Sequence, residues 1–238
     1  MKYLLFLVII MCSLISFAKP IIRIGIVDTG YFLTDPYNNF IHFCEDVESK
    51  DFTKEGMEDY AAHGQNIMHI ITDGLNYNDY CIVMVKVIGR FMLFNFNEYT
   101  EALKYIQNAN LDIINMSIEG ELFYLEEDKM IKSILNSGLT IVASIGNRNK
   151  DLSSKCTSYP ACNDKRVIVV GSLDKNKNPS DFSSYGISNM VWEVGENITA
   201  GGLTQKGTSQ AAAKHTRRLV NNMIKNGVNN HPICKNKP

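Results

Sequence analysis

Stretches rich in β-branched residues alternate with amphipathic stretches along most of this chain of 238 residues. The first kind has the length and composition of buried strands and covers residues 21–27, 81–88, 111–116, 139–145 and 166–172, with a short sixth at 190–194. The second kind has apolar residues at helical spacing and covers residues 63–71, 98–109 and 122–136. Strands that alternate with helices predict an α/β fold, with a mostly parallel central sheet and helices on both of its faces.

Residues 19–238 are predicted to form one domain, because no repeat, low-complexity run or linker divides them. The formal net charge of the whole chain is −1. A charge so close to zero favours neither nucleic acid nor an anionic membrane surface as a partner.

Residues 1–18 differ from the rest of the chain. Lys2 precedes an apolar run that ends near Ile15, and Ser16 and Ala18 are small residues at the two positions that a signal peptidase reads. This pattern predicts a signal peptide cleaved after Ala18, and hence a secreted or periplasmic protein. A transmembrane anchor is the alternative, but the run is short for a bilayer span, so no stable membrane anchor is expected.

The chain has six cysteines, one of which lies in residues 1–18. In a secreted protein the other five are expected to form disulfides, leaving one over. Cys156 and Cys162 bracket a short Tyr-Pro loop and are the first choice for a bridge, and Cys44 with Cys81 is the second. A zinc site is the alternative, but neither a tight cysteine pair nor a suitable histidine spacing supports it.

Polar residues stand at the ends of two predicted strands and at the start of one predicted helix. Asp28 follows the strand at 21–27, Asn147 follows the strand at 139–145, and His63 opens a helix. Functional residues gather at the carboxyl ends of parallel strands. Taken alone, Asp28 is equally well explained as a turn residue, and a single histidine is more often structural.

Gly207, Thr208 and Ser209 lead directly into an alanine-rich helical stretch. Ser209 is therefore predicted to lie at a helix N-terminus, where free N–H groups and the helix dipole stabilise negative charge. The same tripeptide alone is more often a helix cap.

Together these residues form a set suited to acyl transfer. Asp28 could orient His63, His63 could take the proton of Ser209, and Asn147 could donate to an oxyanion. The chain order Asp, His, Ser is that of one of the convergent catalytic triads.

The sequence resembles the subtilisin-like serine proteases through a series of motifs in register. The matching segments are residues 27–30, 63–64, 85–87, 114–117, 143–147, 159–161, 167–171, 182–186 and 207–209. The resemblance covers nearly all of residues 21–224. It implies a subtilisin-like three-layer sandwich and a serine endopeptidase that acts on peptide or protein substrates and needs no cofactor.

The resemblance also implies a role for each matching residue. Ser209 would be the nucleophile and His63 the general base, with Asp28 holding the imidazole in one tautomer. The Asn147 side chain and the Ser209 N–H would form the oxyanion hole.

Ser117, Ile118 and Glu119 occupy the positions whose backbone would pair with an extended substrate. Many members of the family have glycine where this chain has Glu119. We hypothesise that this carboxylate favours basic or polar residues just before the cut, the alternative being a solvated charge on a loop.

The sequence departs from the family in two helices. Met68 and His69 are bulky where the helix that begins at His63 normally packs closely, so the packing there must differ. Ala213 and Lys214 stand where the family has proline and histidine after the serine, and His215, one position out of phase, is assigned no role.

No pro-domain fits between Ala18 and Ile21. We therefore expect the protein to fold unaided, to use a folding helper or activator in trans, or to be activated in another way. Asp35, Asp46 and Asp51 lie in a stretch that could bind calcium, but they lack a recognisable ligand spacing, so no metal ligands are assigned.

Two other functions remain open at this stage. A catalytically silent relative could bind peptides or a partner protein in the same cleft. An esterase with the same triad is disfavoured, because the chain lacks the Gly-x-Ser-x-Gly elbow.

Overall fold

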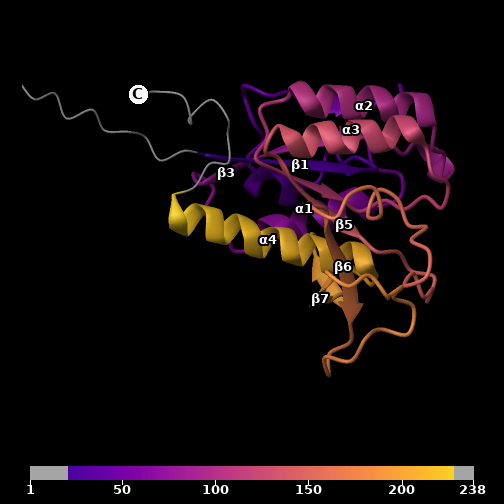
Figure 1. Cartoon of the computed structure of the whole chain (residues 1–238). Helices are drawn as coiled ribbons and strands as arrows, with labels where there is room; N and C mark the ends of the chain where they lie inside the picture. The colour runs from indigo at the N-terminus through magenta and orange to yellow at the C-terminus, as the bar shows by residue number, and fades with distance from the viewer. Residues whose placement is uncertain (1–20, 228–238) are drawn as a thin grey trace, which may run out of the picture.

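A computed structural model describes residues 21–227. Its centre is a sheet of seven strands in the order β2-β3-β1-β4-β5-β6-β7, and every neighbouring pair is parallel (Figure 1). The strands are β1 (Ile22–Asp28), β2 (Lys50–Asp51), β3 (Tyr80–Lys86), β4 (Ile113–Met116), β5 (Thr140–Ser144), β6 (Ile168–Leu173) and β7 (Val191–Val194). The predicted α/β class is confirmed, and β2 is an edge strand that the sequence pattern did not predict.

Helices cover both faces of this sheet, as expected for three layers. Helices α2 (Phe96–Asn108) and α3 (Leu125–Asn136) lie side by side on one face, and α1 (His63–Thr72) and α4 (Thr208–Asn226) lie on the other (Figure 1). Each face has its own apolar core, one around Leu103 and Ile131 and the other around Ile67 and Ala212. Because β1 and β4 are buried between the two cores, most of their side chains are apolar on both faces.

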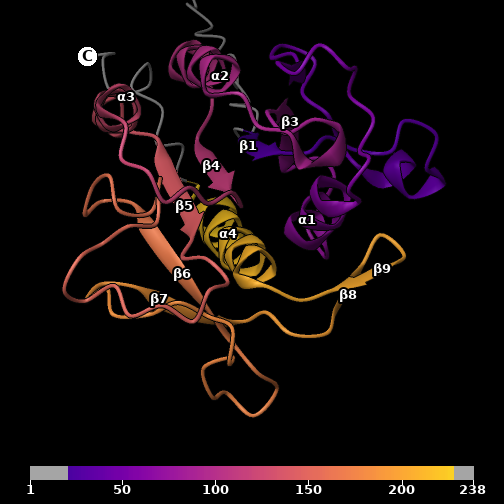
Figure 2. The ribbon, with the colours of Figure 1, turned by 90° about the vertical axis from the view of Figure 1, so that its right-hand side faces the viewer.

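A small antiparallel hairpin explains how the unusual residues of α1 are packed. It consists of β8 (Ile198–Ala200) and β9 (Leu203–Gln205), and it contacts α1 (Figure 2). A Cβ atom added to Gly201, in the hairpin turn, would lie 2.4 Å from the His69 ring. Met68 is fully buried in the core beneath the sheet. Glycine at position 201 thus leaves room for the His69 ring against the hairpin.

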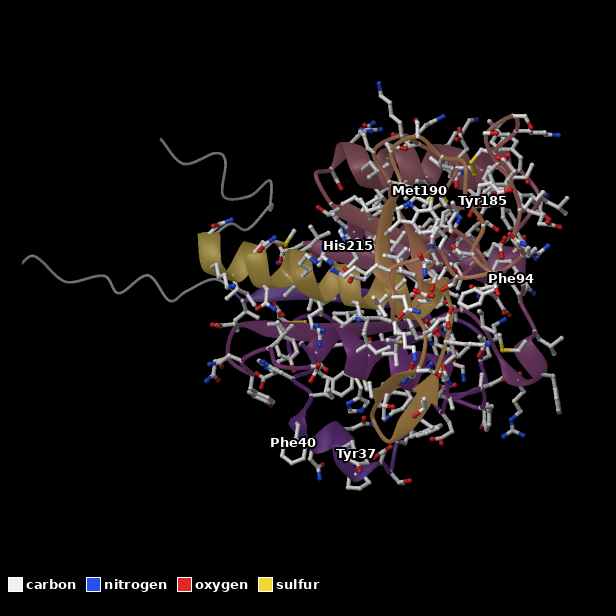
Figure 3. The ribbon with its side chains drawn as sticks, turned by 90° about the horizontal axis from the view of Figure 1, so that it is seen from below. Tyr37, Phe40, Phe94, Tyr185, Met190 and His215 are labelled. Carbon is white, nitrogen blue, oxygen red and sulfur yellow. A yellow bond between two sulfur atoms is a disulfide. The ribbon has the colours of Figure 1, made fainter. Side chains whose placement is uncertain are left out.

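Helix α4 runs without interruption through Ala213 and Lys214, the two positions at which the sequence was expected to depart from the family's pattern. Ala211, Ala212 and Ala213 are fully buried against the sheet, so the small residues let the helix approach it closely. His215 is also buried on this helix (Figure 3).

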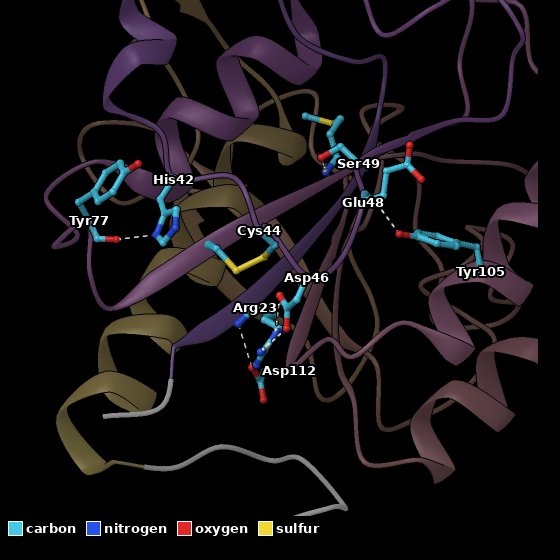
Figure 4. Close-up of a disulfide and its surroundings, with 11 residues drawn as sticks. Arg23, His42, Cys44, Asp46, Glu48, Ser49, Tyr77, Tyr105 and Asp112 are labelled. Carbon is cyan, nitrogen blue, oxygen red and sulfur yellow. Dashed lines mark hydrogen bonds and ion pairs between the residues drawn. A yellow bond between two sulfur atoms is a disulfide. The ribbon is translucent and has the colours of Figure 1, made fainter. Parts of the chain in front are cut away.

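Both expected disulfides are present. Cys44 bonds to Cys81 (Figure 4) and Cys156 bonds to Cys162. The zinc alternative has no support among residues 21–227, where no group of three or more histidine, cysteine or acidic side chains could hold a metal ion. The remaining cysteines and the predicted signal peptide lie outside the described residues. Within those residues no helix is both long and apolar enough to cross a membrane.

Candidate active site

Asp28 is the last residue of β1, and its side chain is fully buried. One carboxylate oxygen, Oδ1, accepts hydrogen bonds from the Thr29 N–H at 2.8 Å and the Thr29 hydroxyl at 3.2 Å. The same oxygen lies 2.7 Å from Nδ1 of His63. A buried carboxylate in that position favours the tautomer with the proton on Nδ1, which leaves Nε2 free to accept a proton.

The start of α1 is fixed by contacts that orient His63. The Thr29 hydroxyl accepts from the Gly64 N–H at 2.8 Å, and Asp59 accepts from the Gln65 N–H at 2.9 Å. A Cβ atom on Gly64 would lie 2.3 Å from the Gly30 carbonyl oxygen, so this close approach requires glycine. The helix is therefore held directly against the end of β1.

The pKa of His63 lies above the ordinary value of 6.5. Burial acts to lower this pKa, but the charge of Asp28, its hydrogen bond and the charge of Asp59 together outweigh burial. Burial in turn raises the pKa of Asp59, against the hydrogen bonds that it accepts from Gln65 and Ala61.

Ser209 is the second residue of α4 and is 7% exposed. Its hydroxyl donates to the Ser117 carbonyl oxygen at 3.4 Å, and in the described residues it makes no hydrogen bond to His63. Both Ser209 and His63 nevertheless line one cavity of about 470 Å³. Serine–histidine contacts are often long in unliganded enzymes, so this geometry is compatible with a triad.

Asn147 follows β5, and Thr208 orients its side chain. Its Oδ1 accepts from the Thr208 N–H at 2.8 Å and from the Thr208 hydroxyl at 3.0 Å. Because these bonds engage the amide oxygen, the amide nitrogen remains available to a ligand. Asn147 lines the same cavity as Ser209.

Ser117, Ile118 and Glu119 follow β4 and also line this cavity. Glu119 lies against the backbone of Gly146, where an added Cβ atom would be 2.3 Å from Oε1. Its Oε2 lies 3.5 Å from Nε of Arg148. Burial raises the pKa of Glu119, against the charge of Arg148. This carboxylate is therefore a half-buried part of the cavity wall and not a freely solvated charge.

The structure also shows supporting residues that the sequence analysis missed. Thr208 orients Asn147, Asp59 fixes the first turn of α1, and Asn115 accepts from the Thr216 hydroxyl of α4 at 2.9 Å while donating to Ser117 at 2.8 Å. Thr208 stands next to the predicted nucleophile, which is a usable signal. Asn115 stands in the matching segment 114–117, but the sequence does not reveal its contact with Thr216, which lies 101 residues away.

The three aspartates considered for calcium make separate contacts. Asp46 pairs with Arg23 at 2.6 Å (Figure 4), Asp35 accepts from the Tyr37 N–H at 2.8 Å, and Asp51 accepts from the Thr53 N–H at 2.8 Å. Each carboxylate is engaged by different donors. The described residues thus give no reason to group them as a ligand set.

Comparison with known proteins agrees with this geometry. The sequence profile of the subtilase family (Peptidase S8) matches residues 21–226. Subtilisin DY from Bacillus licheniformis is 26% identical over 187 residues, which is 74% of this chain and 65% of that protein. The major intracellular serine protease of Bacillus subtilis is 27% identical over 212 residues, or 80% of this chain and again 65% of the relative.

Solved structures show the same fold. A cold-adapted subtilisin-like serine proteinase gives a TM-score of 0.74 at 21% identity, covering 89% of this chain and 78% of that chain. The nisin leader peptidase of Lactococcus lactis gives 0.72 at 18% identity, with coverage of 90% and 80%. At these identities the likeness concerns the fold alone.

Proposed function

Because this chain belongs to the subtilase family, we propose that it is a secreted serine endopeptidase that hydrolyses peptide bonds. The observation that carries the proposal is the 2.7 Å contact between Asp28 and His63 beside a cavity that Ser209 and Asn147 also line. A buried carboxylate, an imidazole and a hydroxyl at a helix N-terminus are the groups that acyl transfer requires.

In the proposed reaction, Oγ of Ser209 attacks the carbonyl carbon of the scissile peptide bond while Nε2 of His63 takes the hydroxyl proton. The negative charge that forms on the carbonyl oxygen is stabilised by the Asn147 amide and the Ser209 N–H. Each such donor contributes about 3–4 kcal/mol to lowering the barrier. His63 then gives its proton to the leaving amine, and water hydrolyses the acyl-enzyme by the same steps in reverse order.

The segment Ser117–Glu119 supports a peptide as the substrate. It continues directly from β4 along the cavity, so an extended chain could pair with its backbone as an added strand. In this pose Glu119 would face the residue just before the cut and would favour a basic or polar side chain there.

Secretion is part of the proposal. Its support is the signal-like pattern of residues 1–18 together with two disulfides, which form and persist in oxidising compartments. A folding helper or activator in trans is compatible with this view.

A peptide-binding relative without catalysis is the second candidate. The observation in its favour is the Ser209 hydroxyl, which donates to Ser117 at 3.4 Å in place of His63. Catalysis requires this hydroxyl to turn toward the imidazole when a substrate binds.

Labelling with a fluorophosphonate separates the two candidates, because the reagent reacts only with an activated serine. We expect the purified protein to be labelled, Ser209→Ala to remain unlabelled, and Ser154→Ala, a change at an exposed serine, to be labelled like the parent. Equal labelling of Ser209→Ala would contradict the assignment of the nucleophile. A folded parent that stays unlabelled, also after incubation with culture extract that could supply an activator, would favour the binding-only candidate.

A further inference from the structure

The cavity beside Ser209 continues to the two helices on the far face of the sheet. Besides His63 and Ser209, it is lined by Tyr99 of α2 and Glu127 of α3. Its walls between these points are largely aromatic and include Phe94, labelled in Figure 3. One cavity thus connects the candidate catalytic residues to an acidic side chain that the proposed reaction does not use.

Glu127 is unusual because its side chain is buried without a cationic partner. It is 4% exposed, and its Oε1 accepts a hydrogen bond from the Tyr99 hydroxyl at 2.9 Å. Its neighbour Asp128 pairs with Lys132 at 2.8 Å, and Glu119 lies 3.5 Å from Arg148. Within residues 21–227, Glu127 forms no ion pair with any lysine, arginine or histidine.

Burial of this carboxyl has an electrostatic cost. It raises the pKa of Glu127 to about 7, against the hydrogen bond from Tyr99 and together with the charge of Asp128. A buried carboxylate recovers much of its lost solvation when a cation binds beside it. A positively charged ligand that enters the cavity would therefore stabilise the ionised form of Glu127.

The aromatic walls narrow the choice of cation. Phe96 and Tyr124 stack with their ring centroids 4.0 Å apart, and both line the cavity with Phe94. Lysine and arginine carry their charge on an apolar stem, so such a side chain could pack along these rings and place its charge at the end. A small inorganic cation would leave the aromatic surface uncovered.

We propose that Glu127 determines substrate specificity by receiving a lysine or arginine side chain of the bound peptide. This inference rests on the proposed peptide-binding function. It concerns a substrate position different from the one that faces Glu119, because Glu119 follows β4 whereas Glu127 lies in the first turn of α3. The competing explanation is a purely structural bond between α2 and α3.

The test uses binding, so that it does not depend on catalysis. Ser209→Ala protein is mixed with a library of extended peptides in which one position at a time is varied, and bound peptides are sequenced. We expect lysine and arginine to be enriched at one position of the peptide, other than the residue that faces Glu119. Adding Glu127→Gln should reduce that enrichment by about tenfold or more, the effect of losing a hydrogen-bonded charge.

Two controls make the result specific. Glu126→Gln removes the same charge from the exposed neighbouring residue and should leave the enrichment unchanged. Glu119→Ala should alter preference only at the residue beside the cut. Replacing the selected lysine by methionine in a single peptide should weaken its binding to the Ser209→Ala protein, which tests the inference even if Glu127→Gln folds poorly.

The inference is overturned if no position selects a basic residue, or if the preference survives Glu127→Gln, which would leave the structural bond as the role of Glu127. If instead the proposed catalytic function is wrong, a different set of results is expected. Fluorophosphonate labelling would then fail while the basic preference and its loss in Glu127→Gln persisted.

Discussion

Asp28 and Glu127 are both buried carboxyls beside the same cavity, but they have different partners. Asp28 lies 2.7 Å from an imidazole, whereas Glu127 accepts from a phenol at 2.9 Å. An imidazole can take up a proton and become a counter-charge, but a phenol with a raised pKa can only donate a hydrogen bond. Burial alone therefore does not set the role of a carboxyl. The charge that its partner can acquire separates the role proposed for Asp28 from the one proposed for Glu127.

The largest expected effect is on kcat and comes from removing the charge of Asp28, the carboxylate beside the imidazole. Asp28→Asn keeps the shape of the side chain but no longer favours the Nδ1–H tautomer or stabilises the imidazolium. We expect kcat on a peptide substrate to fall about 10⁴-fold, while far-ultraviolet circular dichroism stays unchanged. A loss of less than tenfold in a folded variant would show that the two carboxyls are not as different as the structure indicates.

The next largest effect concerns the contribution of Glu127, the carboxyl beside the phenol of Tyr99, to the stability of the fold. The pKa of Glu127 rises from 4.5 to about 7 on folding, so between these values the folded state holds a proton that the unfolded state has lost. The free energy of unfolding should therefore decrease as pH rises from 4.5 to 7, by an amount on the order of 3 kcal/mol. Glu127→Gln should remove this contribution, so that the free energy of unfolding falls less steeply with pH than in the parent.

The pH dependence of the free energy of unfolding can be measured by urea unfolding across pH 4.5–8. The proteins to compare are the parent, Glu127→Gln and Glu126→Gln. Parallel pH profiles for the parent and Glu127→Gln would contradict the raised pKa, and a change in the Glu126→Gln profile would point to net charge as the cause.

The smallest effect is a displacement of the pH profile of catalysis. Since the pKa of His63 is raised above 6.5, the acid limb of kcat/KM should have its midpoint above that value. The charge of Asp59 contributes to this elevation, so Asp59→Asn should move the midpoint toward lower pH. Measuring kcat/KM from pH 5 to 9 in both proteins tests this, and an unmoved midpoint would exclude Asp59 from the electrostatics of His63.

The fold could be predicted because its signals are local. Runs such as residues 21–27 lie within one residue of β1, and the helix predicted from His63 is α1. Boundaries were less accurate where apolar residues are exposed. The helix predicted from residue 122 begins at Leu125, and the exposed apolar residues Leu122, Phe123 and Tyr124 precede it. The short hairpin β8–β9 was missed because its strands of three residues are only partly buried.

The candidate site was predictable only where a motif marks it. Asp28, His63, Asn147 and Ser209 each stand in such a motif, and the structure brings them to one cavity wall or directly behind it. Glu127 carries no such mark. It lies in the acidic first turn of α3, where negative charges commonly interact with the helix dipole. Its partner Tyr99 is 28 residues away on another helix. Its significance depends on burial, which only the fold reveals.

The Cys44–Cys81 bridge joins two points 37 residues apart, and His63 and the whole of α1 lie between them. The histidine is thus carried on a covalently closed ring. A peptide bond broken within this ring, whether by another molecule of the same protein or by a foreign protease, would produce two fragments that stay attached through sulfur. Damage of this kind would keep the imidazole tethered beside β1, and it would become visible as two bands only after reduction.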